Sequence, residues 1–216
     1  MKIALLILVI ISVFSSCKDQ TTDPPVVPYA YVTIGSQVWM KRNLDVDHYR
    51  NGDPIPEVKD SEEWANLKTG AWCYYNNSSI SGDFFGKLYN WYAVNDPRGL
   101  APLGWHIPTD AEWSSLTEYL GGADIAGGKL KAIDSILWQS PNTGATNETG
   151  FSALPGDKRD SNGTFGNVGY IGNWWSSSEG SSSLAWFRIL FYDNVTVGRF
   201  YFKKESAFSV RCVKDN

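Results

Sequence analysis

The sequence predicts an α+β domain, and two observations lead to that fold class. Apolar residues recur at helical spacing in the first half of the chain, whereas short β-rich runs separated by Gly, Asn, Ser and Asp follow from Gly150 onward. No repeat with a period of about 20 to 50 residues occurs, so the sequence excludes solenoids and propellers.

The first expected element is a hairpin. Tyr31 to Met40 consists of two short β-rich runs, and Gly35-Ser36 between them suits a two-residue turn. A short helix is expected from Glu62 to Leu67, ending near Gly70, and a buried strand from Ala71 to Tyr75.

The strongest helical pattern covers Thr109 to Leu120. Thr109 and Glu112 have the spacing of a capping box, in which each side chain accepts a hydrogen bond from the backbone amide of the other. Gly121-Gly122 ends this helix. A weaker helix is expected over Ala126 to Ile133, where two glycines cost about 1 kcal/mol each relative to alanine.

Three strong β-rich runs close the chain, over residues 185–192, 195–202 and 207–213. The turns between them are short, so we expect the three runs to pair antiparallel in sequence order, as a meander. In the last run Phe208, Val210 and Cys212 fall on one face, which we expect to point into the core.

The chain begins like an exported protein. Met1-Lys2 and the apolar run to Phe14 are typical of a signal peptide, which we assign to residues 1–16. Ser15-Ser16-Cys17 resembles a lipobox, where the thiol of Cys17 receives a lipid. The alternative is an ordinary signal peptide cleaved near Ser16.

Behind the signal peptide, residues 17–28 read as a lipidated tether, and residues 29–216 as a single domain. The partner implied by the lipid is a membrane. Lys18 follows Cys17 where inner-membrane retention would need aspartate, and Lys18-Asp19-Gln20 resembles the charged tag of surface-exported lipoproteins in Bacteroidota. We therefore expect an outer-membrane lipoprotein exposed at the cell surface.

The composition limits the partners. The formal net charge is -4 at pH 7, and no cluster of Lys or Arg could follow a phosphate backbone, so we expect no nucleic acid. The 10 Trp, 11 Tyr and 10 Phe supply ample core material. Oligomeric state is left open by the sequence.

Few residues are suited to nucleophilic or metal chemistry. His48 and His106 are the only histidines, and we interpret His106 as a structural imidazole, with an unrecognised catalytic site near it as the alternative. Behind Cys17 only Cys73 and Cys212 remain, and two outcomes stay open: a disulfide in an oxidising compartment, or two buried free thiols.

No cofactor and no metal are expected. Asp45 and Asp47 would share one strand face, and residues 157–162 supply several oxygens, so calcium is an alternative at both places. Neither stretch matches the twelve-residue calcium loop, and exposed loop carboxylates are the favoured interpretation.

The remaining feature that indicates a function is the large number of aromatic residues next to polar, Gly-rich loops. Aromatic faces flanked by Asn, Asp and Arg commonly stack on sugar rings or contact protein partners. We place the contact face between Gly156 and Tyr192, with six candidate ligand-binding residues: Arg159, Asn162, Tyr170, Asn173, Trp175 and Tyr192.

Several stretches carry a family resemblance. Residues 86–113, 128–131, 142–151, 174–179 and 208–213 closely resemble the Fibrobacter succinogenes major paralogous domain, over about Val32 to Lys214. That family looks like a branch of the C-type-lectin-like superfamily, which also holds formylglycine-generating enzymes. The resemblance implies a mixed fold of two helices and small twisted antiparallel sheets, with the first and last strands close together.

The departures bear on function. The reactive cysteine pair of the related enzymes has no counterpart here, and the calcium-sugar signatures of C-type lectins are absent. We therefore expect a non-catalytic cell-surface module that binds a glycan or a protein, with an enzyme or a purely structural envelope protein as alternatives. Asp134-Ser-Ile136 resembles an O-glycosylation sequence of Bacteroidota, which makes Ser135 a candidate site.

Overall fold

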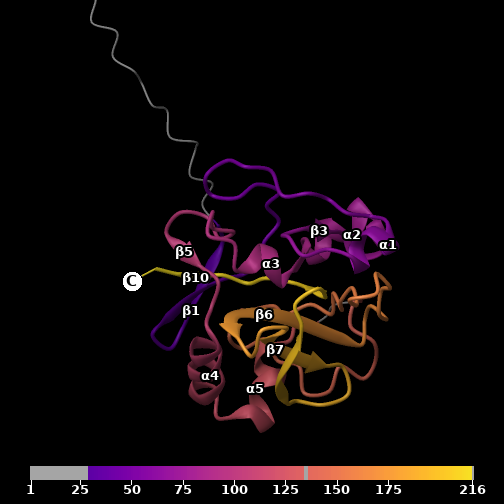
Figure 1. Cartoon of the computed structure of the whole chain (residues 1–216). Helices are drawn as coiled ribbons and strands as arrows, with labels where there is room; N and C mark the ends of the chain where they lie inside the picture. The colour runs from indigo at the N-terminus through magenta and orange to yellow at the C-terminus, as the bar shows by residue number, and fades with distance from the viewer. Residues whose placement is uncertain (1–28, 134–135, 216) are drawn as a thin grey trace, which may run out of the picture.

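A computed structural model describes residues 29–133 and 136–215 of the chain (Figure 1). The expectations for the signal peptide, for Cys17, for the tether and for Ser135 fall outside these residues. The described part is a mixed α+β structure in which short helices and small sheets alternate with long connecting segments.

The helices of the described residues are short. They are α1 (Ser61–Ala65), α2 (Ser79–Phe85), α3 (Trp91–Val94), α4 (Asp110–Tyr119) and α5 (Ala123–Leu130), together with the 3-10 turn η1 (Tyr75–Asn77). Within residues 29–133 and 136–215, none of the helices has the length and hydropathy that crossing a membrane requires.

The strands form three antiparallel sheets. The first has the order β1 (Tyr31–Ile34), β2 (Gln37–Met40), β10 (Val213–Lys214), β5 (Trp105–His106). The second has the order β3 (Trp72–Cys73), β4 (Leu88–Asn90), β9 (Ala207–Phe208). The third has the order β6 (Ile171–Glu179), β7 (Leu184–Phe191), β8 (Val197–Lys203).

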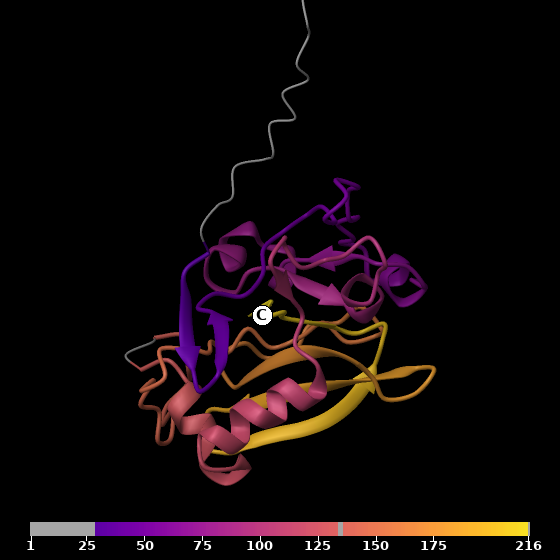
Figure 2. The same ribbon diagram turned by 90° about the vertical axis from the view of Figure 1, so that its left-hand side faces the viewer.

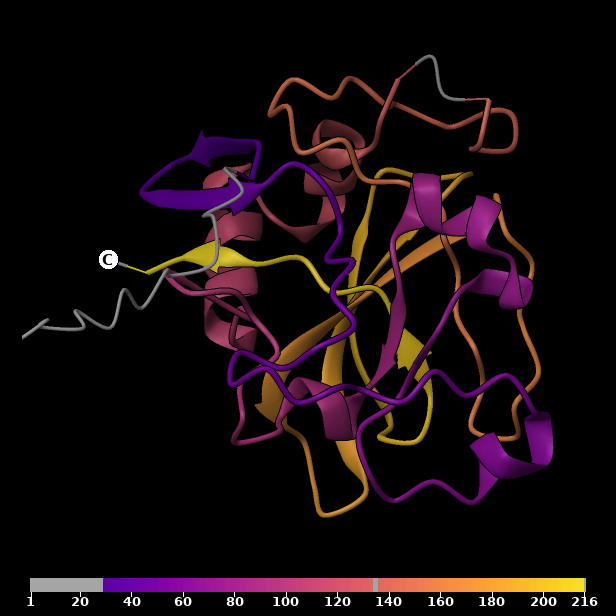
Figure 3. The same cartoon turned by 90° about the horizontal axis from the view of Figure 1, so that it is seen from above.

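The expected hairpin is confirmed, and its sheet joins the two ends of the described chain. Ile34 pairs with Gln37 across the turn, where Gly35 adopts a φ of 61° that suits glycine. Val213 of β10 pairs with Trp39 of β2, so the hairpin and the carboxyl-terminal strand lie side by side (Figure 3). This pairing agrees with the closeness of first and last strands that the family resemblance implies.

The two longest expected helices are present. Helix α4 has the predicted capping box: the Thr109 side chain accepts from the Glu112 amide, and the Glu112 carboxylate accepts from the Thr109 amide. Helix α5 begins and ends three residues earlier than expected. Its Gly127 lies so close to the segment that leads into β8 that an added Cβ would stand 2.4 Å from the Thr196 carbonyl oxygen, which explains a glycine within a helix.

The expected meander is wrong in its third run. Strands β7 and β8 pair antiparallel over their whole length, but residues 207–213 leave this sheet, and β9 pairs with β4 while β10 pairs with β2 and β5. The run is not one strand because its two ends serve different sheets. Phe208, Val210 and Cys212 nevertheless point into the core as predicted.

Burial of charged side chains is a feature that the sequence did not reveal. Lys131, Arg159 and Arg211 are 0 to 1% exposed. Lys131 and Arg159 donate to backbone carbonyls, and Arg211 donates to the carbonyls of Met40 and Phe151 and to the side chain of Asn43. Lys131 Nζ donates to the carbonyls of Thr143, Phe191 and Asn194 at 2.8, 2.9 and 2.8 Å. These cations supply the hydrogen bonds that regular secondary structure would otherwise provide.

Candidate functional site

Three of the six candidate ligand-binding residues are buried, which corrects the sequence interpretation. Arg159 and Trp175 are 0% exposed and Asn173 is 2% exposed. Arg159 lies over the rings of Trp64 and Phe165, and its guanidinium donates to backbone carbonyls that include those of Val58 and Gly163. It holds loops together rather than facing a ligand.

The other two buried candidates belong to β6. Trp175 Nε1 donates to the Tyr89 carbonyl at 2.9 Å, and the Trp175 ring packs on Phe208 at a centroid distance of 4.2 Å. The carboxyl-terminal segment runs along this strand, because the Trp175 amide donates to the Ser209 carbonyl. A role in ligand binding would require this part of β6 to be accessible to solvent. The carboxyl-terminal segment covers it instead.

The remaining three candidates lie at or near the surface. Tyr170 is 44% exposed, and Tyr192 packs edge-on against it at a centroid distance of 5.1 Å. The Tyr192 amide also donates to the Tyr170 carbonyl at 2.9 Å. Asn162 is exposed in a separate turn, where its Oδ1 accepts from the amide and hydroxyl of Thr164. The structure thus brings Tyr170 and Tyr192 together and leaves Asn162 apart.

An open groove of about 470 Å³ lies beside Tyr170. We call it the Tyr170 groove; its lining residues are Asp157, Lys158, Gly166, Asn167, Tyr170 and Ile171. Backbone bonds position its walls, since the Asp157 amide donates to the Ile171 carbonyl and the Gly166 amide to the Lys158 carbonyl. The groove therefore has an aromatic side chain, an amide and an ammonium along its rim.

A buried carboxylate forms part of the groove wall. Asp157 is 1% exposed, and its Oδ1 accepts a long hydrogen bond from the side-chain Nδ2 of Asn173 at 3.4 Å. Burial raises the pKa of Asp157 to about 6, and the Lys158 charge opposes that rise. A Cβ at Gly166 would lie 2.0 Å from Asp157 Oδ2, so only glycine fits against this carboxylate. Sequence reasoning considered Asp157 as a calcium ligand but missed Lys158 and Asn167.

The alternative site near His106 is a hydrogen-bonded cluster of His106, Glu112 and Asp215. His106 Nδ1 lies 2.7 Å from Asp215 Oδ1, and Nε2 lies 2.7 Å from Glu112 Oε1. Burial lowers the pKa of His106, but the hydrogen bonds to Glu112 and Asp215 outweigh it and raise the pKa overall. Both ring nitrogens therefore face carboxylates, which leaves neither free to act as a base.

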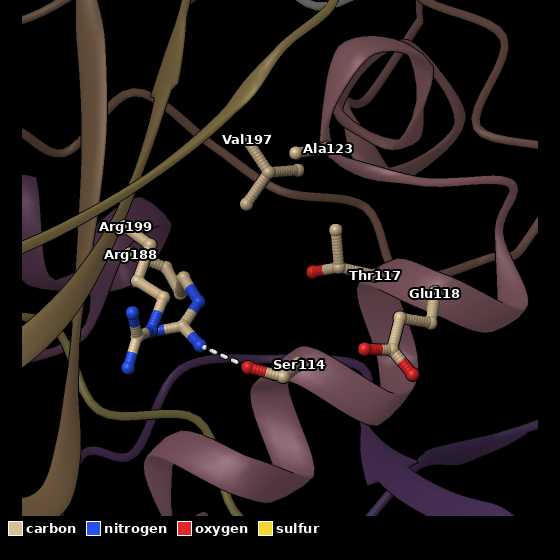
Figure 4. A pocket seen from close by; sticks show the side chains of 7 residues that line it. All are labelled: Ser114, Thr117, Glu118, Ala123, Arg188, Val197 and Arg199. Carbon is tan, nitrogen blue, oxygen red and sulfur yellow. Dashed lines mark hydrogen bonds between the residues drawn. The ribbon is translucent and has the colours of Figure 1, made fainter.

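A second hollow, of about 290 Å³, lies between α4 and the strands β7 and β8 (Figure 4). Arg188, 2% exposed, donates to Asp110 Oδ1 at 2.7 Å and to Ser114 Oγ at 3.0 Å. Arg199 binds the same Asp110 carboxylate at 2.8 Å and lies over the Trp186 ring at 4.0 Å. Both guanidiniums share one carboxylate, and the Glu118 side chain lines the same hollow.

The cysteines and the candidate calcium residues are placed as follows. Cys73 and Cys212 are buried free thiols, the second of the two outcomes left open, and burial raises the pKa of each to about 12. Asp45 pairs with Lys87, and Asp47 Oδ1 lies 2.6 Å from His48 Nδ1, so the two carboxylates have different partners. Within residues 29–133 and 136–215, no group of three or more His, Cys, Asp or Glu is arranged to hold a metal ion.

Comparison with known proteins gives one match. The model of the Fibrobacter succinogenes major domain matches residues 32–214. No curated protein and no solved structure matches the chain. The matched range includes the Tyr170 groove, His106 and Glu112 of the His106 cluster, and the three sheets except for the first residue of β1.

Proposed function

The chain belongs to the Fibrobacter succinogenes major domain family, and from that premise we propose that it is a non-catalytic surface module that binds a glycan in the Tyr170 groove. The single observation that carries the proposal is the groove itself. A half-exposed tyrosine stands beside an amide, an ammonium and a buried carboxylate, in a space of about 470 Å³.

The chemistry of the groove suits a sugar. A ring face of Tyr170 can stack on the apolar face of a pyranose, while Lys158 and Asn167 can donate to hydroxyl and carbonyl oxygens. Tyr192 packs against Tyr170 and limits its rotation, so less conformational entropy is lost on binding. A protein ligand is the alternative occupant of the groove, and a pull-down of surface proteins tests it.

The proposal also includes the cellular location of the protein. A lipid on Cys17 tethers the domain through residues 17–28 to the outer membrane, with the domain at the cell surface. The lipobox-like Ser15-Ser16-Cys17 supports this part. Incorporation of labelled palmitate into the wild type and its loss in Cys17→Ser test the anchor. We also propose a C-type-lectin-like fold, supported by the pairing of β2 with β10, which superposition of an experimental structure would test.

The binding test uses the full chain in detergent on a glycan array and in a pull-down of surface proteins. We expect array signals, and for the strongest glycan a loss of affinity of about tenfold in Tyr170→Ala. The matched control is Tyr31→Ala, which removes a tyrosine of 59% exposure from β1. Equal losses in both variants, or blank results in array and pull-down, contradict the proposal.

A further inference from the structure

The outer edge of β8 lacks the strand that the sequence pattern predicts beside it. Residues 207–213 cross to the other two sheets, so β8 pairs with β7 alone. Figure 2 shows β8, in yellow, at the outer edge of its sheet with no further strand beyond it. In the described part of the chain, residues 198–202 make no backbone hydrogen bond outside the β7–β8 pair.

This edge is long and carries exposed aromatic side chains. Strand β8 has seven residues, no proline and no bulge, and Phe200 and Tyr201 are 55% and 56% exposed. Folded proteins usually protect such an edge with short length, proline or a bulge, because its free amides and carbonyls are a template for another strand. The only protective feature here is positive charge.

Arg199 and Lys203 are exposed on one face of the strand, and Arg199 shares the Asp110 carboxylate with the buried Arg188. On the other face the Lys158 ammonium lies 4.9 Å from the Phe202 ring centroid and is paired with Asp160 at 3.0 Å. Strand β8 itself has no acidic residue, although the whole chain has a net charge of -4. Lys203, together with two guanidiniums that share one carboxylate, leaves net positive charge beside this edge of an acidic protein.

The charge pattern selects between occupants. If a second copy paired antiparallel about Tyr201, Arg199 would stand opposite Lys203, and like charges placed directly opposite are destabilising. An extended segment with carboxylates at every second position can instead place one carboxylate opposite Arg199 and another opposite Lys203. This is possible because alternate residues of a strand lie on the same face.

We propose that β8 is a docking edge for an extended, acidic segment of another protein, which adds to the sheet as a fourth strand. Main-chain hydrogen bonds to residues 198–202 supply affinity, and Arg199 and Lys203 supply the preference for carboxylates. Rows of packed side chains hold the edge rigid, since Tyr201 meets Trp186 edge-on at 5.3 Å and Arg199 covers the same ring. The proposed contacts use none of the residues that line the Tyr170 groove, although one of those residues, Lys158, lies close to β8.

The probe for the test is a blocked synthetic peptide of about nine residues that alternates glutamate with valine. Fluorescence anisotropy with the full chain in detergent should give saturable binding. A matched peptide with lysine in place of glutamate should bind at least about tenfold more weakly. A glutamate peptide with N-methyl groups on alternate amides, which cannot complete the ladder, should lose affinity by a similar factor.

A second part of the experiment reverses a charge on the protein. Lys203→Glu should weaken the glutamate peptide about tenfold and improve the lysine peptide, whereas the control Lys41→Glu, also at an exposed lysine, should change neither. Hydrogen exchange should show new protection confined to alternate amides of β8. No binding, equal binding of both peptides, or a wild-type dimer in sedimentation whose β8 amides are already protected without peptide would overturn the proposal.

Discussion

Buried charges are stabilised differently beside α4 and in the connecting segments between residues 131 and 170. Beside α4, Arg188 is 2% exposed and meets the Asp110 carboxylate at 2.7 Å. In the connecting segments, Lys131 is 0% exposed and donates to three backbone carbonyls without a carboxylate. Asp157 is the reverse case, a buried carboxylate with no cation in hydrogen-bonding contact among the bonds described.

The difference follows from the local backbone. A helix and a long hairpin satisfy their own amides and carbonyls, so charged side chains there can pair with each other. Irregular segments leave carbonyls unpaired in the interior, and an ammonium with three donors can satisfy several of them at once. Arg211 does the same for the carbonyls of Met40 and Phe151. Loss of such a cation should therefore disturb several segments together.

The largest effect should come from removing the Lys131 cation. Lys131→Met leaves three carbonyls without donors, and we expect the free energy of unfolding in urea to fall by about 3 to 5 kcal/mol. The matched control is Lys129→Met, since Lys129 pairs near the surface with Glu148 at 3.1 Å. The control should cost less than about 1 kcal/mol. Similar losses in the two variants would refute the distinction drawn between these regions.

A smaller effect should come from the lone carboxylate. Burial raises the pKa of Asp157 from 3.8 to about 6, so the native state binds the proton more tightly than the unfolded state. Stability from this group is present at low pH and is lost as pH rises from about 4 to about 6, by at most about 3 kcal/mol. In Asp157→Asn, the free energy of unfolding in urea should change less with pH over this range.

The control for that experiment is Asp160→Asn, which alters a carboxylate paired with Lys158 at 3.0 Å. It should retain most of the wild-type loss of stability between about pH 4 and about pH 6, because burial raises the pKa of Asp157 more than the Asp160 charge does. If Asp157→Asn keeps the same slope as Asp160→Asn, the buried carboxylate is not the source of the pH dependence.

The smallest effect is expected at the His106 cluster. Its hydrogen bonds to Glu112 and Asp215 raise the pKa of His106 against the effect of burial, so its stabilisation is complete below the ordinary value of 6.5. That stabilisation is lost as pH rises through the raised pKa. The imidazole side chain is 38% exposed, so solvent screening keeps the effect below about 1 kcal/mol.

The free energy of unfolding of the wild type should fall between about pH 6 and about pH 9 as His106 loses its proton. In His106→Gln this fall should be smaller, as measured by chemical unfolding at both pH values. Asp215→Asn removes one of the two carboxylates and should produce part of the same change. A stability difference between wild type and His106→Gln that stays constant across this range would exclude the imidazolium as the stabilising form.

Prediction from sequence succeeded where the determining interactions are local. The hairpin at Gly35 and the capping box of Thr109 and Glu112 each depend on residues a few positions apart, and both are present. The candidate site was predicted in part. Tyr170 and Tyr192 pack together at the surface, with Tyr192 partly buried, whereas Arg159 and Trp175 are buried because segments more than 80 residues away cover them.

By itself, the sequence determined the fold class, the main helix, the opening hairpin and the inward face of the last segment, because spacing and turn chemistry are encoded within short windows. Only the tertiary structure decided where residues 207–213 pair, which cations are buried, and which edge and groove remain open. Those outcomes depend on contacts between residues far apart in the chain, and no local pattern specifies which of several compatible partners a segment meets.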